Sequence, residues 1–441
     1  MTESIVISGG TIIDGRGGAP IKDGVIVIDG KRITSVGAVS TPVPPYATKI
    51  DATGKFLTPG LMNSSIYLFC DRPPIATIRY EGRYDELIIE AAQLALKGGV
   101  TTVFDAWGPR EYLIKARDDI NEGRQTGARI YCSGAIIGTG GPVSDDFYPD
   151  ARAALFEYGN KLNAMWEQGV GRDLMSQSLD EARAAVRRYA ESGVNFLKYA
   201  VTSINPEKPP YIVFSPRFQR MIVDEGHRAG IPVRSFSVSV EGIHLAADAG
   251  ADILGHADVT GPSQGLLPET VDLLVRHRTP TPILATPEES FVWLKKFAPW
   301  YENIERNHRA LLRAGAKVLL ATDGGILSSN TKTNPVLTEV PYDRLLDDPT
   351  RGHFNWLLAA EEKGLNAMDS LIAATRDIAR AYQIDSDLGT LEAGKIADLL
   401  ILDKNPLDRA ENYRSISQVI KEGRVVDRSA LPTKRLLSES D

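Results

Sequence analysis

The sequence predicts an α/β fold, a (β/α)8 TIM barrel with a small β-sandwich domain formed by both chain ends. Residues 4–58 are patterned as β-strands, and eight short apolar runs then alternate with amphipathic helical stretches. After a predicted helix at 367–382, the chain becomes β-like again. We therefore expect residues 1–58 plus 386–430 to form the composite sandwich, 59–385 to form the catalytic barrel, and 431–441 to be a C-terminal tail.

Each of these predicted elements has a local signal. Asp29-Gly30 separates two β-branched runs, 25–28 and 32–36, and indicates a hairpin because glycine tolerates the positive φ of a primed turn. Apolar runs separated by helical patterns such as 179–192 are typical of buried parallel strands, and eight such units close into a barrel. The eight runs are 64–68, 101–105, 128–132, 195–199, 232–236, 252–256, 282–286 and 317–323.

The composition favours a soluble globular protein over other classes of protein. A net charge of -7 argues against binding to a phosphate backbone, which needs a basic surface. Two cysteines, Cys70 and Cys132, are too few for a disulfide framework. The first residues are patterned as a strand and not as a signal peptide, and no run approaches the roughly 20 apolar residues of a membrane span. We expect a cytoplasmic protein with a small-molecule substrate and with no nucleic-acid or membrane partner.

Four motifs lie along the chain in an order that carries a family resemblance. They are GGTIID at 9–14, LTPGL at 57–61, GVTTV at 99–103 and LGTLEAGKIADL at 388–399. On these motifs the chain resembles the amidohydrolase superfamily, in its imidazolonepropionase/prolidase-like branch, over nearly its full length. The resemblance implies a barrel enzyme whose site lies at the C-terminal ends of the strands, and a homodimer or higher homo-oligomer.

The resemblance also implies where metal ligands should lie, and several of them are missing. Members of the superfamily hold one or two divalent metals with a His-x-His pair on strand 1, a lysine carbamate on strand 4, a histidine on each of strands 5 and 6, and an aspartate on strand 8. In this chain Ser65 and Tyr67 stand at the His-x-His positions, and Phe236 stands at the strand-5 position. The chain has six histidines, and no two are separated by a single residue. We therefore expect a divergent member without a two-metal site.

Three of the family positions keep their residue, namely Lys198, His256 and Asp323. Lys198 follows a β-branched and aromatic strand, where an unpaired ammonium is unfavourable, so a functional lysine of lowered pKa is favoured over a surface one. It could act as a general base or as a cation paired with Asp323. His256 could act as an acid/base or be a satisfied core histidine, and Asp323 could act in catalysis or cap the following turn. With Tyr67 as a proton donor, an oxyanion ligand or a packing residue, these four are the candidate catalytic residues.

A second set of residues around the predicted barrel mouth is a candidate for binding substrate. Phe236 would exclude water from the site, and the segment 291–300 after strand 7 could form a lid. Aromatic residues at helical spacing are more often part of a core, so both interpretations stay open. A flat aromatic substrate with an anionic or phenolic group would suit this set. Its members are Ser65, Tyr199, Phe236, Trp107, Trp293, Trp300, Arg72, Arg79 and Arg83.

Three functions remain open at this point. The first is metal-independent acid/base chemistry on a small organic molecule without any cofactor, by a lyase (elimination or retro-aldol-type cleavage) or by an isomerase. The second is a mono-metal hydrolase of amide-like C–N bonds, with one zinc-like divalent metal on Lys198 (as a carbamate), His256 and Asp323. The third is a non-catalytic protein that binds a ligand in the same barrel.

Overall fold

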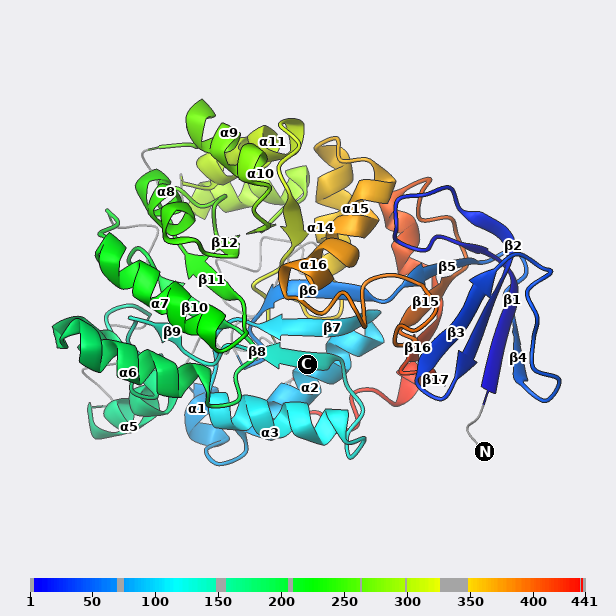
Figure 1. The fold of residues 1–441 in the computed structure, drawn as a ribbon, viewed down its shortest axis with the longest axis horizontal. Helices are drawn as coiled ribbons and strands as arrows, with labels where there is room; N and C mark the ends of the chain where they lie inside the picture. Colours follow the sequence, from blue (N-terminus) through cyan, green and yellow to red (C-terminus); the bar gives the residue numbers. More distant parts are fainter. Residues whose placement is uncertain are drawn as a thin grey trace.

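The computed structural model describes residues 4–69, 75–147, 156–204, 209–261, 264–297, 300–325, 348–436 and 438 (Figure 1). The chain begins with β1 (Ser4–Ile12), β2 (Ile21–Asp29) and β3 (Arg32–Gly37), which pair as an antiparallel meander. Asp29 lies opposite Arg32, and Gly30 between them has a φ of 57°, in the left-handed region that favours glycine. The predicted Asp29-Gly30 hairpin is therefore confirmed.

Strands from both ends of the chain share one sheet. The N-terminal part adds β4 (Thr48–Asp51) and β5 (Phe56–Pro59), and the C-terminal part adds β15 (Leu399–Leu402), β16 (Ile416–Lys421) and β17 (Arg424–Val425). Among the described residues this sheet has eight strands, in the order β17-β16-β15-β5-β1-β2-β3 with β4 on β1. Strand β15 runs antiparallel to β5, and their apolar side chains share a core. The two chain ends therefore pair with each other in one continuous hydrogen-bonded sheet, and the sandwich and its boundaries stay a prediction.

The middle of the chain supplies a set of parallel strands. They are β6 (Leu61–Ile66), β7 (Val100–Asp105), β8 (Arg129–Cys132), β9 (Ile136–Ile137), β10 (Leu197–Ala200), β11 (Val233–Phe236), β12 (Ile253–Gly255), β13 (Thr281–Ile283) and β14 (Val318–Leu320). They pair as β6–β7–β8, β9–β10–β11–β12 and β13–β14, while β12 contacts β13 and β14 contacts β6. This ring order is the one that the predicted (β/α)8 barrel requires.

Helices follow the strands and lie outside them (Figure 1). They are α1 (Ile75–Arg79), α2 (Tyr84–Lys97), α3 (Arg110–Asn121), α5 (Phe156–Glu167), α6 (Leu179–Ala190), α7 (Pro216–Arg228), α8 (Val240–Ala249), α9 (Pro268–His277), α10 (Glu288–Phe297), α11 (Tyr301–Arg313), α14 (Gly352–Glu362), α15 (Ala367–Ala373) and α16 (Arg376–Ala381). Serines cap three of them, because Ser178, Ser215 and Ser239 each accept a backbone N–H from the first turn of α6, α7 or α8. In the described ranges, no helix is both long enough and apolar enough to cross a lipid bilayer.

Candidate functional site

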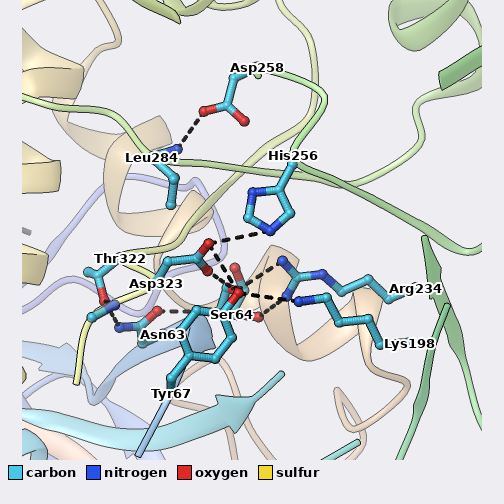
Figure 2. A network of polar contacts seen from close by, with 12 residues as sticks. Asn63, Ser64, Tyr67, Lys198, Arg234, His256, Asp258, Leu284, Thr322 and Asp323 are labelled. Carbon is cyan, nitrogen blue, oxygen red and sulfur yellow. Dashed lines mark hydrogen bonds and ion pairs between the residues drawn. The ribbon is translucent and has the colours of Figure 1, made fainter. Parts of the chain in front are cut away.

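The candidate site lies at the carboxyl ends of four barrel strands. Lys198 is on β10, Tyr67 directly follows β6, His256 directly follows β12, and Asp323 comes just after β14. Their side chains turn toward one another (Figure 2). Lys198 Nζ lies 3.3 Å from the Tyr67 hydroxyl oxygen, which lies 3.4 Å from Asp323 Oδ2. The same carboxylate oxygen lies 3.3 Å from His256 Nε2. The structure thus brings together the four residues that the sequence proposed as catalytic.

Ser65 joins this cluster from β6 and holds Asp323 in place. Its hydroxyl donates a short hydrogen bond to Asp323 Oδ1, and its carbonyl oxygen accepts the N–H groups of Thr322 at 3.1 Å and of Asp323 at 2.9 Å. On the same strand, Asn63 Nδ2 donates to Thr322 Oγ1 at 2.8 Å. These bonds tie the segment after β14 to β6, so the Asp323 carboxylate has a defined position.

Two residues of the cluster have a left-handed backbone, with φ of 60° at His256 and 47° at Asp323. This conformation costs about 1–3 kcal/mol for a residue other than glycine and persists where the surroundings enforce it, often at functional sites. The surroundings of His256 are firmly held, because the Asp258 carboxylate accepts the Leu284 N–H at 2.8 Å and lies 2.8 Å from His308 Nε2. The strained backbone supports a functional role for the contact between His256 and Asp323.

Burial determines the charge of Lys198. Its side chain is fully buried, and its Nζ lies 5.3 Å and 5.4 Å from the ring centroids of Tyr67 and Phe236. Burial, followed by the positive charge of Arg234, lowers the pKa of Lys198 from 10.5 to about 7, against the opposing effect of nearby carboxylates. The amine is therefore neutral in a large fraction of molecules near pH 7 and can accept a proton.

His256 and Asp323 have opposite charge states near neutral pH. Burial lowers the pKa of His256 to about 4, so its imidazole is neutral, and its Nε2 lies 3.3 Å from Asp323 Oδ2 without making a hydrogen bond to any described residue. Burial works to raise the pKa of the Asp323 carboxyl. Positive charge at the neighbouring His256, Lys198 and Arg234 side chains outweighs burial and leaves that pKa below its usual value. Of these three neighbours, Arg234 is the one that stays fully charged near pH 7, because the His256 imidazole is neutral and the Lys198 amine is partly neutral.

Arg234 belongs to this cluster, although the sequence analysis passed over it. It lies on β11 beside Lys198 on β10, and its guanidinium donates to the Ser64 carbonyl oxygen at 3.0 Å and to the Ser65 hydroxyl at 2.9 Å. A signal was present, because an arginine within the apolar run 232–236 must be buried and so needs partners. The family pattern directed attention two residues further along, to Phe236.

Asp105, at the end of β7, is a second residue that the sequence analysis missed. Its carboxylate accepts the Leu68 N–H at 2.7 Å and the Trp107 N–H at 3.2 Å, so it fixes the backbone directly after Tyr67. Burial raises the pKa of Asp105 to about 7, although both hydrogen bonds and the charge of Lys198 act to lower it. The acidic end of the apolar run 101–105 was the available signal.

Two of the predicted substrate-binding aromatic residues lie beside the cluster. The Phe236 ring contacts the His256 ring with centroids 4.6 Å apart, and the Trp107 ring meets the Tyr67 ring edge-on at 6.3 Å. These two rings form an apolar border on the reactive side chains. Trp300 packs against the small apolar group that contains Phe236.

The prediction that Tyr199 binds substrate is wrong. Side chains alternate along a strand, so Lys198 and Tyr199 on β10 point to opposite faces. Tyr199 is fully buried in the core, with its hydroxyl 3.4 Å from Gln219 Oε1 on α7. It therefore packs between the strands and the helices and does not face the cluster.

The remaining predicted binding residues do not join the contacts of the cluster. Arg79 and Arg83 are exposed, and the Arg83 guanidinium is bound by Glu86 at 2.7 Å. The Trp293 ring lies against Lys296 of the same helix, with Nζ 4.1 Å from the ring centroid. Arg72 and residues 298–299 of the predicted lid lie outside the described residues.

The residues of the cluster do not fit a catalytic divalent metal. A catalytic zinc takes at least three protein donors, and the cluster offers one imidazole from His256 and one carboxylate from Asp323. In the described ranges, no three His, Cys, Asp or Glu side chains come close enough to share a metal. Lys198 would add a donor only as a carbamate, and the guanidinium of Arg234 beside it adds positive charge.

Comparison with known proteins agrees with the fold. The profile of the Amidohydrolase family matches residues 86–426. The structure is similar to that of phenylurea hydrolase B, with 35% identity, a TM-score of 0.93 and coverage of 99% of each chain. It is similar to molinate hydrolase, with 34% identity, a TM-score of 0.92 and coverage of 99% of this chain and 97% of that one. Ochratoxinase of Aspergillus niger is 24% identical over 443 residues, covering 95% of this chain and 86% of that protein. Imidazolonepropionases and prolidases also match, as the sequence motifs predicted.

Proposed function

Because this chain belongs to the amidohydrolase family, we propose that it is a hydrolase that cleaves a carbonyl C–N bond in a small urea-like or carbamate-like molecule with an aromatic group. The observation that carries the proposal is the contact chain Lys198–Tyr67–Asp323 at the carboxyl ends of the barrel strands. Members of the family commonly bind a metal. Since the donor set of this chain does not fit one, we assign the proton transfers to its own side chains.

In the proposed reaction, the neutral Lys198 amine takes a proton from a water molecule as the water oxygen attacks the carbonyl carbon. The carbon gains a hydroxyl group, the bond to nitrogen breaks, and Lys198 returns the proton to the departing nitrogen. The lowered pKa of Lys198, about 7, suits both steps, because the amine must first accept and then release the same proton. The reaction consumes only water.

The other residues of the cluster support this proton transfer. The Tyr67 hydroxyl, between Lys198 and Asp323, orients the amine and can donate to the oxygen that becomes negative. Asp323 stays ionised and balances the ammonium that forms on Lys198. The Nε2 of the neutral His256 lies 3.3 Å from Asp323 Oδ2 without forming a hydrogen bond among the described residues, so it can bind a polar group of the substrate.

The proposed substrate class rests on the apolar border and on the relatives. Phe236 and Trp107 place aromatic rings beside the cluster, and Trp300 packs against the apolar group that contains Phe236; such surroundings suit an aromatic group. Phenylurea hydrolase B and molinate hydrolase are 34–35% identical to this chain over nearly its full length, and both are named as hydrolases. The elimination, retro-aldol and isomerisation reactions expected from the sequence have no counterpart among these relatives, so they form no part of the proposal.

The proposal is tested with a substrate panel and three variants. Purified protein is incubated with N-aryl ureas, N-aryl carbamates and N-acyl amino acids, and release of the amine is measured by chromatography. We expect release of an aryl amine, and a loss of about 100-fold or more in Lys198→Met and Tyr67→Phe. Lys421→Met, which removes a mostly buried lysine from β16, should retain activity and is the matched control.

Two outcomes would replace this proposal with the earlier alternatives. If as-purified protein contains one equivalent of metal and loses activity on chelation, the mono-metal hydrolase is favoured. If the protein binds members of the panel but turns over none of them, the non-catalytic ligand-binding protein is favoured.

A further inference from the structure

Arg234 reaches across the interior of the barrel from β11 to β6. Its Nη1 donates to the Ser64 carbonyl oxygen at 3.0 Å and lies 3.4 Å from the Tyr382 hydroxyl, while its Nη2 donates to the Ser65 hydroxyl at 2.9 Å. The side chain is 1% exposed, so its charge is fixed in the protein interior. A guanidinium suits this position because it stays charged and its planar fork can serve several acceptors at once.

The neighbouring strand leaves room for this guanidinium. Gly255, at the end of β12, lies beside it, and a Cβ atom at that position would stand 2.7 Å from Arg234 Nε. Contacts this short do not occur, so any larger residue at 255 would force the arginine to move. The absence of a side chain at Gly255, immediately before His256, therefore leaves the space that the Arg234 guanidinium occupies.

Through Ser65, Arg234 is connected to the candidate catalytic carboxylate. The Ser65 hydroxyl accepts from Arg234 Nη2 and donates to Asp323 Oδ1, so the guanidinium, the hydroxyl and the carboxylate form a continuous chain. The other carboxylate oxygen lies near the Tyr67 hydroxyl and His256 Nε2. Both oxygens of Asp323 therefore already have partners from the protein.

We propose that Arg234 is the fixed cation of this site, which positions Ser65 and Asp323 and keeps a divalent metal from binding between Asp323 and His256. A metal ion there would stand close to the guanidinium and to Lys198, its neighbour in the strand pairing, and like charges repel strongly where water is excluded. The catalytic consequence rests on the proposed function, whereas the exclusion of metal does not. Arg234 acts through Ser65 and is a positioning residue.

Metal binding to the whole chain tests this inference without a substrate. Wild-type protein, Arg234→Lys and Arg234→Gln are titrated with Co²⁺ and Zn²⁺, and binding is measured by calorimetry, by Co²⁺ absorbance and by metal analysis after dialysis. We expect weak binding to wild type and to Arg234→Lys, which keeps the charge. Arg234→Gln should bind at least about tenfold more tightly, because the repelling charge is gone. The same three residues at position 234 are then compared in a Ser65→Ala background. Because the Ser65 hydroxyl is absent there, differences in metal affinity reflect the charge at position 234 and not the placement of Ser65. We expect the three affinities to keep the same order.

The possible results separate this inference from the proposed function. Tight binding of one equivalent of metal by the wild type would overturn the inference, and so would equal affinities in wild type and Arg234→Gln. If Arg234→Gln does not fold, wild type and Arg234→Lys must both bind weakly for the inference to stand. Where a substrate is found, Arg234→Lys should lose kcat while KM stays within about threefold, because the charge remains but the two-pronged hold on Ser64 and Ser65 is lost. Failure of every substrate in the panel would leave the metal result unaffected.

Discussion

Replacing Lys198 by methionine should abolish activity and stabilise the fold. Methionine has a similar length and fills the same buried space without a charge. The pKa of Lys198 is about 7 in the folded protein, against 10.5 for an ordinary lysine. A tenfold change in proton affinity corresponds to about 1.4 kcal/mol, so burying the charged amine costs up to about 5 kcal/mol. The pKa of about 7 already includes the attraction to nearby carboxylates, so the loss of the Tyr67 hydrogen bond and imperfect packing of the new side chain are what offset part of this gain. We expect a net stabilisation of about 2–3 kcal/mol near pH 7.

The pH dependence of this effect is a sharper test than its size. The folded pKa lies below the unfolded one, so the unfolded chain binds more protons between about pH 7 and pH 10.5. The stability of wild type therefore rises with pH across this window. Lys198→Met lacks the titrating amine, so its stability has no such rise. The advantage of the variant should be largest at pH 7 and below and should shrink toward pH 10.

The assay is chemical denaturation of both proteins between pH 6 and pH 10, with the thermal midpoint as a second measure. Lys404→Met is the control, because Lys404 is exposed and its removal should change stability little at any pH. A variant at position 198 that is less stable than wild type at pH 7 would refute the reasoning. A stabilisation that stays constant with pH would show that packing, and not the buried charge, is responsible.

Three further predictions follow from the same contacts. Tyr67→Phe should reduce kcat about 100-fold with little change in thermal midpoint, because it removes only the hydroxyl between Lys198 and Asp323. Wild-type kcat/KM should rise about tenfold per pH unit below about pH 7 and level off above it, because Lys198 must be neutral; a falling limb in that range would contradict its role as base. Arg129→Met should lower the free energy of unfolding by about 3–5 kcal/mol in denaturant titrations, because it leaves the buried Asp398 without the partner that now lies 2.6 Å away. An unchanged midpoint in Arg129→Met would show that this ion pair between the barrel and the terminal sheet adds no stability.

The fold could be predicted from the sequence because strand and helix patterns are local and repeated. The hairpin at Asp29-Gly30 and the eight apolar runs need only neighbouring residues to be recognised, and the order of parallel strands follows from the order of the runs. The strand after the LTPGL motif shows the limit of this approach. The apolar run was placed at 64–68, whereas β6 spans Leu61–Ile66, so Tyr67 stands just beyond the strand.

The site was predictable where the family resemblance assigns a position to a barrel strand. Lys198, His256 and Asp323 were identified in this way, and the structure brings them together with Tyr67. Tyr199 was misassigned because the alternation of side chains along β10 was not applied, since two successive residues of a strand cannot both face the barrel interior. Arg234 was missed because the family pattern drew attention to Phe236, and its partners on β6 and directly after α16 are far away in the sequence.

The strand pairing explains why the lysine of this site can act as a base. Lys198 lies opposite Arg234 in the pairing of β10 with β11, so two cationic side chains enter the same interior side by side. Arginine keeps its proton under all ordinary conditions, so the repulsion between the two is relieved only when the lysine releases its own. The ionised Asp323 carboxylate accepts a hydrogen bond from the Ser65 hydroxyl, which in turn accepts one from Arg234. The negative charge of Asp323 is therefore partly balanced by the arginine through Ser65. The guanidinium therefore stabilises the carboxylate, and it adds to the larger effect of burial in lowering the pKa of the amine. The same buried arginine thus contributes both to an aspartate that stays charged and to a lysine that becomes neutral near pH 7.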